Sequence, residues 1–157
     1  MNGNLILAFA FGIGVVAGLR ALTAPAVVSW ATHLGWLHLL DSPVAFMAST
    51  WAAILFSFLA VFELVADKLP TTPNRTAPPA LAARLLTGGL GGACLCVAAH
   101  QSLGLGAAMG AIGAVAGAFG GYQVRKRLVN GWKIKDLFVA LAEDLVAIGL
   151  ACVLVMR

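Results

Sequence analysis

Residues 61–79 read VFELVADKLPTTPNRTAPP, and they close a long apolar run with two carboxylates, Glu63 and Asp67. Because residues four apart lie one turn apart on the same helix face, these two acids are predicted to stack. A loop punctuated by prolines follows and carries Asn74 and Arg75. Ionisable residues inside apolar segments are costly, and they mark functional sites. This stretch is therefore predicted to form the floor of a polar site.

The composition predicts an integral membrane protein. Hydrophobic residues make up 61% of the 157 residues and charged residues only 10%, and the mean hydropathy is +0.97. Soluble domains carry about a quarter charged residues. The apolar runs are continuous, as in membrane-spanning helices. The length fits a single transmembrane domain over residues 1–157.

Five apolar runs are predicted to span the membrane, so the expected fold class is all-α. The runs cover residues 4–20, 44–66, 80–99, 103–122 and 136–155. Between the first two, residues 26–40 are too short and too mixed in composition to span. Pro25 is predicted to break or kink the chain before this segment. Because it carries His33 and His38 beside tryptophans, we expect an interfacial or re-entrant helix, with the histidines at the headgroup boundary.

The fourth run carries glycines spaced by four, three, four and four residues, so they fall on one stripe of a helix. Stripes of small residues let helices pack closely in lipid. We therefore expect this glycine zipper to pack helices within the chain or between copies, with a homodimer as the favoured oligomer. The stripe consists of Gly106, Gly110, Gly113, Gly117 and Gly121.

The basic residues predict a topology. Half of the ten lysines and arginines lie between Arg125 and Lys135, and the isoelectric point is about 9.4. Membrane proteins keep such basic loops in the cytoplasm. With five spans, the N-terminus is predicted to be cytoplasmic and the C-terminus periplasmic or external. We interpret the basic cluster as a determinant of topology and of contact with anionic lipid, not as a nucleic-acid site.

The charged residues inside the spans are predicted to converge. By the helical rise, Glu63 and Arg84 each lie roughly 6 Å inside their helix ends and Glu143 about 10 Å inside. All three enter from the same side, so a cluster in the inner third of the bilayer is expected. Its carboxylates outnumber its arginines, and a bound cation or protons would offset the surplus. The predicted substrate or ion site is Glu63, Asp67, Arg84, Glu143 and Asp144, with Arg20, Asn74 and Arg75 as secondary candidates.

Two pairs of segments suggest an internal repeat. Residues 14–20, GVVAGLR, echo residues 117–125, GAFGGYQVR, and residues 61–67, VFELVAD, echo residues 141–147, LAEDLVA. With five spans, the first and fourth would run in opposite directions, as an inverted repeat requires. A weak inverted repeat is therefore predicted.

Three motifs together resemble one known family. They are GLRALTAP at residues 18–25, ELVADKLP-x-TP-x-RTAP at residues 63–78, and AED at residues 142–144, beside the glycine-rich fourth run. This pattern resembles the small bacterial membrane proteins grouped as domain of unknown function 4126, over most of the chain. The resemblance implies a bacterial inner-membrane protein with several helices. It brings no established activity, substrate or catalytic residue.

Three function classes remain open. The first and favoured one is a transporter or channel-like protein for a small solute or cation, which uses the carboxylate and arginine site. The second is an intramembrane enzyme that acts on lipid or phosphate substrates with a carboxylate-bound metal. Against it, position 43 after His38 is Pro43, so there is no His-x4-Asp pair, and no catalytic residue or cofactor is assigned. The third is a structural subunit of a membrane assembly.

Overall fold

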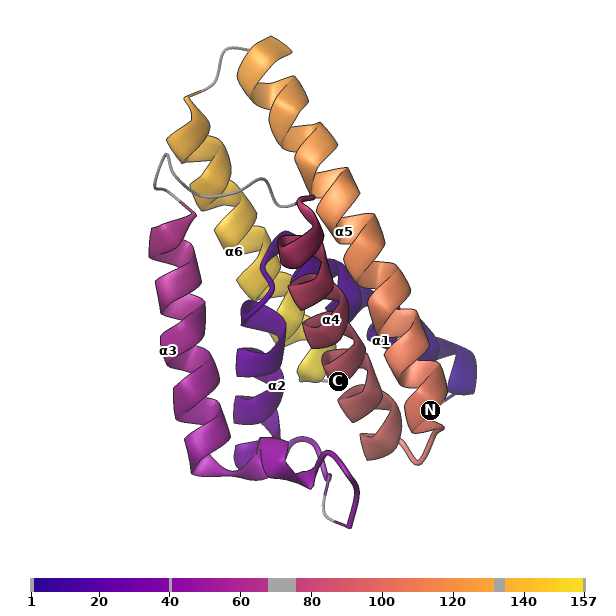
Figure 1. The fold of residues 1–157 in the computed structure, drawn as a ribbon. Coiled ribbons are helices and arrows are strands. Elements are labelled where there is room, and N and C mark those ends of the chain that lie inside the picture. The colour runs from indigo at the N-terminus through magenta and orange to yellow at the C-terminus, as the bar shows by residue number, and fades with distance from the viewer. Residues whose placement is uncertain (1, 40, 68–75, 132–134, 157) are drawn as a thin grey trace.

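The protein is a bundle of helices. The computed structural model describes residues 2–39, 41–67, 76–131 and 135–156, and these contain helices and connecting turns but no strand (Figure 1). The all-helical prediction is confirmed for this part of the chain. The elements are α1 (Gly3–Leu19), α2 (Thr23–His33), the short 3-10 helix η1 (Ala45–Ala48), α3 (Thr50–Ala66), α4 (Pro78–Ala98), α5 (Leu103–Gly131) and α6 (Asp136–Val155).

Three of the described helices, α4, α5 and α6, are long and apolar enough to cross a membrane. This is fewer than the five spans predicted. Helices α1 and α3 are apolar but only 17 residues long. The second run is shorter than expected because its first residues form η1. Helix α3 then begins at Thr50, where the side chain of Ser49 accepts a hydrogen bond of 3.1 Å from the backbone of Ala52.

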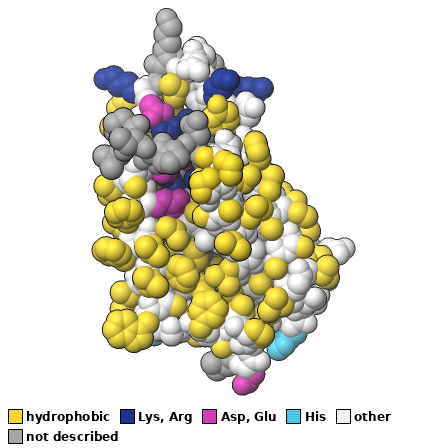
Figure 2. All heavy atoms as spheres, viewed as in Figure 1, with side chains coloured by type: hydrophobic (Ala, Val, Ile, Leu, Met, Phe, Trp, Pro, Cys, Tyr) yellow, Lys and Arg dark blue, Asp and Glu magenta, His cyan; other side chains and the backbone are white. Residues whose placement is uncertain are grey.

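The outer surface is compatible with contact to lipid. Figure 2 shows hydrophobic side chains over most of one face, whereas lysine and arginine side chains and most of the acidic ones collect in its upper part. Large side chains such as Trp51 and Phe58 of α3 and Leu145 of α6 project outward, and Trp51 is 82% exposed. Exposed apolar surface of this extent marks interaction with a membrane or with other apolar partners.

Glycines bring α1, α4 and α5 into direct backbone contact. A Cβ atom added at Gly110 would lie 2.1 Å from the carbonyl oxygen of Gly88 in α4, and one at Gly113 would lie 2.1 Å from that of Phe11 in α1. No side chain fits at such distances. The stripe thus packs within the chain through Gly106, Gly110, Gly113 and Gly117, which are buried, whereas Gly121 is partly buried. Dimerisation stays a prediction.

The same contacts give the helix directions. Gly14 of α1 lies against Gly110 of α5, and Gly18 lies against Gly117, so α1 and α5 run parallel. An inverted repeat would require them to run in opposite directions. The predicted inverted repeat is therefore wrong for this pair, and their similarity reflects the shared demand for small residues at close helix contacts.

Helix α2 lies inside the bundle, which corrects the expected interfacial or re-entrant segment at residues 26–40. It is buried along most of its length, between Thr23 and Thr32. Pro25 does not break it, because a proline in the first turn lacks only an amide that would have no helical partner. Its polar groups find partners inside the bundle: Thr32 donates to the Val28 carbonyl at 2.8 Å. The two histidines, His33 and His38, are exposed.

Helix α2 also changes the topology. It runs antiparallel to α3, because Leu22 lies beside Glu63 and Trp30 beside Ser57. The chain therefore passes along the bundle once more than predicted. Consequently both termini lie towards the same end, where Ile6 and Val155 line one pocket (Figure 1). The expectation of termini at opposite ends is wrong for this reason.

Candidate functional site

The centre of the charged region is the non-helical turn at residues 20–22, between α1 and α2, which we call the break. Helix α1 ends at Leu19, Arg20 is extended with φ −139° and ψ 104°, and α2 begins at Thr23. A helix end leaves carbonyl groups unpaired, and a helix start leaves N–H groups unpaired. The negative end of the α1 dipole and the positive end of the α2 dipole therefore meet within a few residues.

An arginine from α4 caps the end of α1. The Arg84 guanidinium donates hydrogen bonds to the carbonyl oxygens of Gly18 at 2.9 Å and Leu19 at 3.1 Å. Arg84 is buried, with 5% of its surface exposed. A cation is favourable at this end of a helix, both through its hydrogen bonds and through the dipole.

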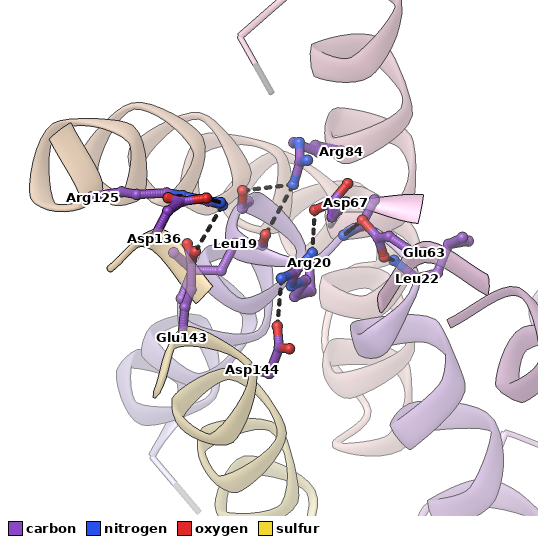
Figure 3. A network of polar contacts seen from close by, with 12 residues as sticks. Leu19, Arg20, Leu22, Glu63, Asp67, Arg84, Arg125, Asp136, Glu143 and Asp144 are labelled. Carbon is purple, nitrogen blue, oxygen red and sulfur yellow. Dashed lines mark hydrogen bonds and ion pairs between the residues drawn. The ribbon is translucent and has the colours of Figure 1, made fainter. Parts of the chain in front are cut away.

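A carboxylate from α3 caps the start of α2. The two oxygens of Glu63 accept hydrogen bonds from the backbone N–H of Ala21 at 2.9 Å and of Leu22 at 2.8 Å. The negative charge faces the positive end of α2. The break is thus held by opposite charges from two other helices, and Figure 3 shows both caps around it.

Arg20 itself is the central charge. Its side chain is fully buried and forms ion pairs with Asp67 at the end of α3 and with Asp144 of α6, the latter at 2.5 Å (Figure 3). Its Nε atom has no hydrogen-bond partner among the described residues. A buried guanidinium needs close anions to offset its desolvation, and here two helices supply one each.

A second cluster joins α5 to α6. Arg125 donates to both carboxylate oxygens of Asp136, at 2.8 and 2.7 Å, and its guanidinium lies 3.9 Å from Glu143. This fork geometry makes the Arg125–Asp136 pair the most specific contact of the group. Glu143 therefore faces Arg125, although Asp144, its neighbour in sequence, faces Arg20.

The structure brings together most of the predicted site residues. Glu63, Asp67, Arg84 and Asp144 surround the break, and Glu143 lies in the adjoining cluster. Arg20, which the sequence indicates only as a secondary candidate, occupies the centre. The other two secondary candidates, Asn74 and Arg75, lie outside the described residues.

Sequence reasoning missed two parts of the site. It treated Arg125 as a determinant of topology, although Asp136 begins the next predicted helix and was available as a partner. It also overlooked the backbone of residues 18–22 as a source of polar groups. The stretch from Arg20 to Pro25 carries a usable signal. Because proline favours the first turn of a helix, Pro25 indicates that a new helix begins just before it and that the preceding helix ends near Arg20.

The site combines the polar backbone groups of residues 18–22 with more carboxylates than arginines. Three arginines meet five carboxylates in the described clusters, namely Arg20, Arg84 and Arg125 against Glu63, Asp67, Asp136, Glu143 and Asp144. Helix ends that lie inside a bundle can supply ion sites through their polar backbone groups and dipoles. Here the protein's own side chains occupy both ends, so an entering ion would have to exchange with them. Among the described residues, no group of three or more His, Cys, Asp or Glu side chains is placed to hold a metal ion.

Comparison with known proteins supports the resemblance seen in the motifs. No curated protein and no solved structure matches the chain. One family model matches residues 7–156, a region that includes the break at Arg20, both clusters and nearly all of the helices around them. The chain therefore belongs to the family described as domain of unknown function DUF4126.

Proposed function

We propose that this protein is a membrane transporter or channel-like protein for a small cation or solute, gated by the ion pairs of Arg20. The observation that carries the proposal is that one fully buried arginine is shared by Asp67 and Asp144, which lie on different helices. When a cation or a proton binds to one of two acids that share a guanidinium, the guanidinium can stay paired with the other acid alone.

We propose a membrane arrangement that is supported by the helix directions. Helices α1, α3, α4, α5 and α6 cross the bilayer, with α1 and α3 as its shortest spans, and α2 with the segment after it returns the chain to its starting side. Arg125, Lys126 and Arg127 lie at the end of the bundle remote from both termini. By the positive-inside rule this end is cytoplasmic, so both termini are external. The host membrane is the inner membrane of a bacterial cell.

Helix α3 is the moving part in this proposal. It packs mainly against α2 and η1, whereas α1, α4 and α5 are locked together by backbone contacts at glycines. The C-terminal end of α3 is held by two contacts, the hydrogen bonds of Glu63 to the start of α2 and the ion pair between Asp67 and Arg20. A cation or proton at Asp67 would release the ion pair, and Arg20 would remain paired with Asp144.

The energy needed to separate Asp67 from Arg20 is compatible with a gate. Removing one partner from a buried ion pair costs about 3–5 kcal/mol, because the remaining charge is left uncompensated. In this cluster Asp144 stays beside Arg20 at 2.5 Å when Asp67 leaves. The second acid therefore lowers the cost of opening below that of breaking an isolated pair.

The test is a flux assay with purified full-length protein in liposomes. Proton entry is followed with a trapped pH-sensitive dye, and entry of Na⁺ or K⁺ with ion-sensitive dyes, under an imposed membrane potential. The wild type is expected to pass at least one of these cations, and Asp67→Asn and Asp144→Asn are expected to reduce the flux at least tenfold.

The matched control is Asp41→Asn. Asp41 is a carboxylate outside both clusters, and its φ of 66° is a conformation that asparagine also tolerates. This variant is expected to keep the wild-type flux. If the wild type passes none of the cations, or if Asp67→Asn and Asp144→Asn pass them unchanged, Arg20 and its partners form a structural lock and the transport proposal is wrong.

A further inference from the structure

The far end of α5 carries a surface that the transport proposal does not use. Four polar side chains, Gln123, Lys126, Arg127 and Asn130, line a shallow surface pocket of about 580 Å³. Their spacing of three, one and three residues places them on one helix face. All four are exposed. Among the described residues, no acid forms an ion pair with Lys126 or Arg127, whereas Arg125 pairs with Asp136 and Glu143.

An apolar strip continues this face toward the middle of the helix. Ile112, Val115 and Phe119 are exposed at 57%, 38% and 47%, and they lie at helical spacing below Gln123. The opposite face of α5 holds the buried glycines that contact α1 and α4. The exposed face therefore changes from apolar to basic along its length, with no described helix packed over it.

We propose that this face binds one anionic phospholipid, with its phosphate at Lys126 and Arg127 and an acyl chain along Phe119, Val115 and Ile112. Gln123 and Asn130 flank the two basic residues and can hydrogen-bond to phosphate or glycerol oxygens. The order of groups along the helix matches the order in a phospholipid. A free phosphate ion would use only the polar half of this surface.

The length of α5 puts the basic residues at the required depth. The helix has 29 residues, which corresponds to about 43 Å at the α-helical rise, whereas the hydrocarbon core of a bilayer is about 30 Å thick. The apolar strip ends at Phe119 and the basic residues begin two turns later, where a helix of this length leaves the hydrocarbon. Basic side chains at that level attract anionic headgroups.

The experiment measures lipid binding to the purified full-length protein by native mass spectrometry. Phosphatidylglycerol is titrated against phosphatidylcholine of the same acyl chains, for the wild type and for the double variant Lys126→Gln/Arg127→Gln. The wild type is expected to bind phosphatidylglycerol more tightly, and the double variant is expected to lose roughly tenfold or more of that affinity.

The control is Lys135→Gln, which removes a positive charge from an exposed residue that does not line the pocket. It is compared with the single variant Lys126→Gln, which removes one charge from the pocket. Lys135→Gln is expected to retain phosphatidylglycerol binding within about twofold, whereas Lys126→Gln is expected to weaken it more. Equal losses in these two variants would mean that net charge alone attracts the lipid, and the site proposal would be wrong.

Two further measurements examine each half of the surface. The substitution Phe119→Ser is expected to weaken phosphatidylglycerol binding while leaving phosphate binding unchanged. Inorganic phosphate is expected to compete poorly with the lipid. If millimolar phosphate displaces phosphatidylglycerol completely, or if Phe119→Ser has no effect, the surface binds phosphate groups without a lipid chain and the phospholipid assignment is overturned. Loss of cation flux has no bearing on these outcomes.

Discussion

The guanidinium of Arg84 lies 2.9 Å from the carbonyl oxygen of Gly18, so a side chain of α4 ends the first helix of the chain. Arg84 is buried, and its hydrogen bonds to Gly18 and Leu19 go to carbonyl groups that α1 itself cannot pair. The contact explains why an arginine is tolerated nearly two turns inside the apolar helix α4: its guanidinium pairs with carbonyl groups that a further turn of α1 would have paired.

We predict that Arg84→Met destabilises the protein by about 1–3 kcal/mol, because two buried carbonyl groups lose their donor. Arg84→Lys keeps the charge but cannot reproduce the fork of donors, so its cost is expected to lie between those of wild type and Arg84→Met. Thermal unfolding in detergent, followed by circular dichroism, measures both. Equal stability of Arg84→Met and wild type would contradict the capping role.

Removal of the central arginine is expected to be more damaging. Arg20→Met leaves the buried Asp144 and the partly buried Asp67 without their shared cation, at a cost of about 3–5 kcal/mol. The triple variant Arg20→Met/Asp67→Asn/Asp144→Asn removes all three charges, and we expect it to recover most of this loss. The same unfolding measurement tests it. A triple variant no more stable than Arg20→Met would show that the ion pairs are not what Arg20 contributes.

Two glycines of α5 form a matched pair for testing the packed core. A Cβ atom at Gly113 would lie 2.1 Å from the backbone oxygen of Phe11, whereas one at Gly120 would meet nothing within 4 Å. Gly113→Ala is expected to destabilise by about 2–3 kcal/mol through overpacking. Gly120→Ala is expected to be neutral or to stabilise by up to about 1 kcal/mol, since alanine favours helix. Similar effects of the two substitutions would rule out close contact between α1 and α5.

The additional pass made by α2 predicts where the ends of the protein lie. Short epitope tags added to each terminus are expected to be protected or digested together when sealed vesicles are treated with a protease. A tag inserted after Gly131, at the far end of α5, is expected to show the opposite accessibility. Termini that differ in accessibility would restore the topology of five spans with ends on opposite sides.

The sequence identified the acids of the site because their signal is local. Glu63 and Asp67 are four residues apart in an apolar run, so their helix face and depth follow from helical geometry. The same reasoning placed Arg84 near them. It could not rank Arg20, because the importance of Arg20 comes from partners on α3 and α6 that only the folded chain brings to it.

The errors have physical causes as well. Residues 23–33 contain serine, threonine, tryptophan and histidine, which look interfacial when each side chain is considered alone. In the bundle their polar groups pair locally or with neighbours: Trp30 donates to Ser57 at 2.8 Å, and Ser29 lies 3.6 Å from the sulfur of Met47. Burial of this helix added the pass that reversed the expected topology, and composition could not reveal those pairings.

The position of Arg20 in the chain has a consequence for biosynthesis. The ribosome makes Arg20 before either of its acidic partners, and Asp144 is made long after Asp67. The nascent chain must therefore hold a lone guanidinium at the end of α1 until α3 delivers Asp67, and the second partner arrives only with α6. The reversal between α1 and α2 is therefore synthesised well before its charges are fully paired.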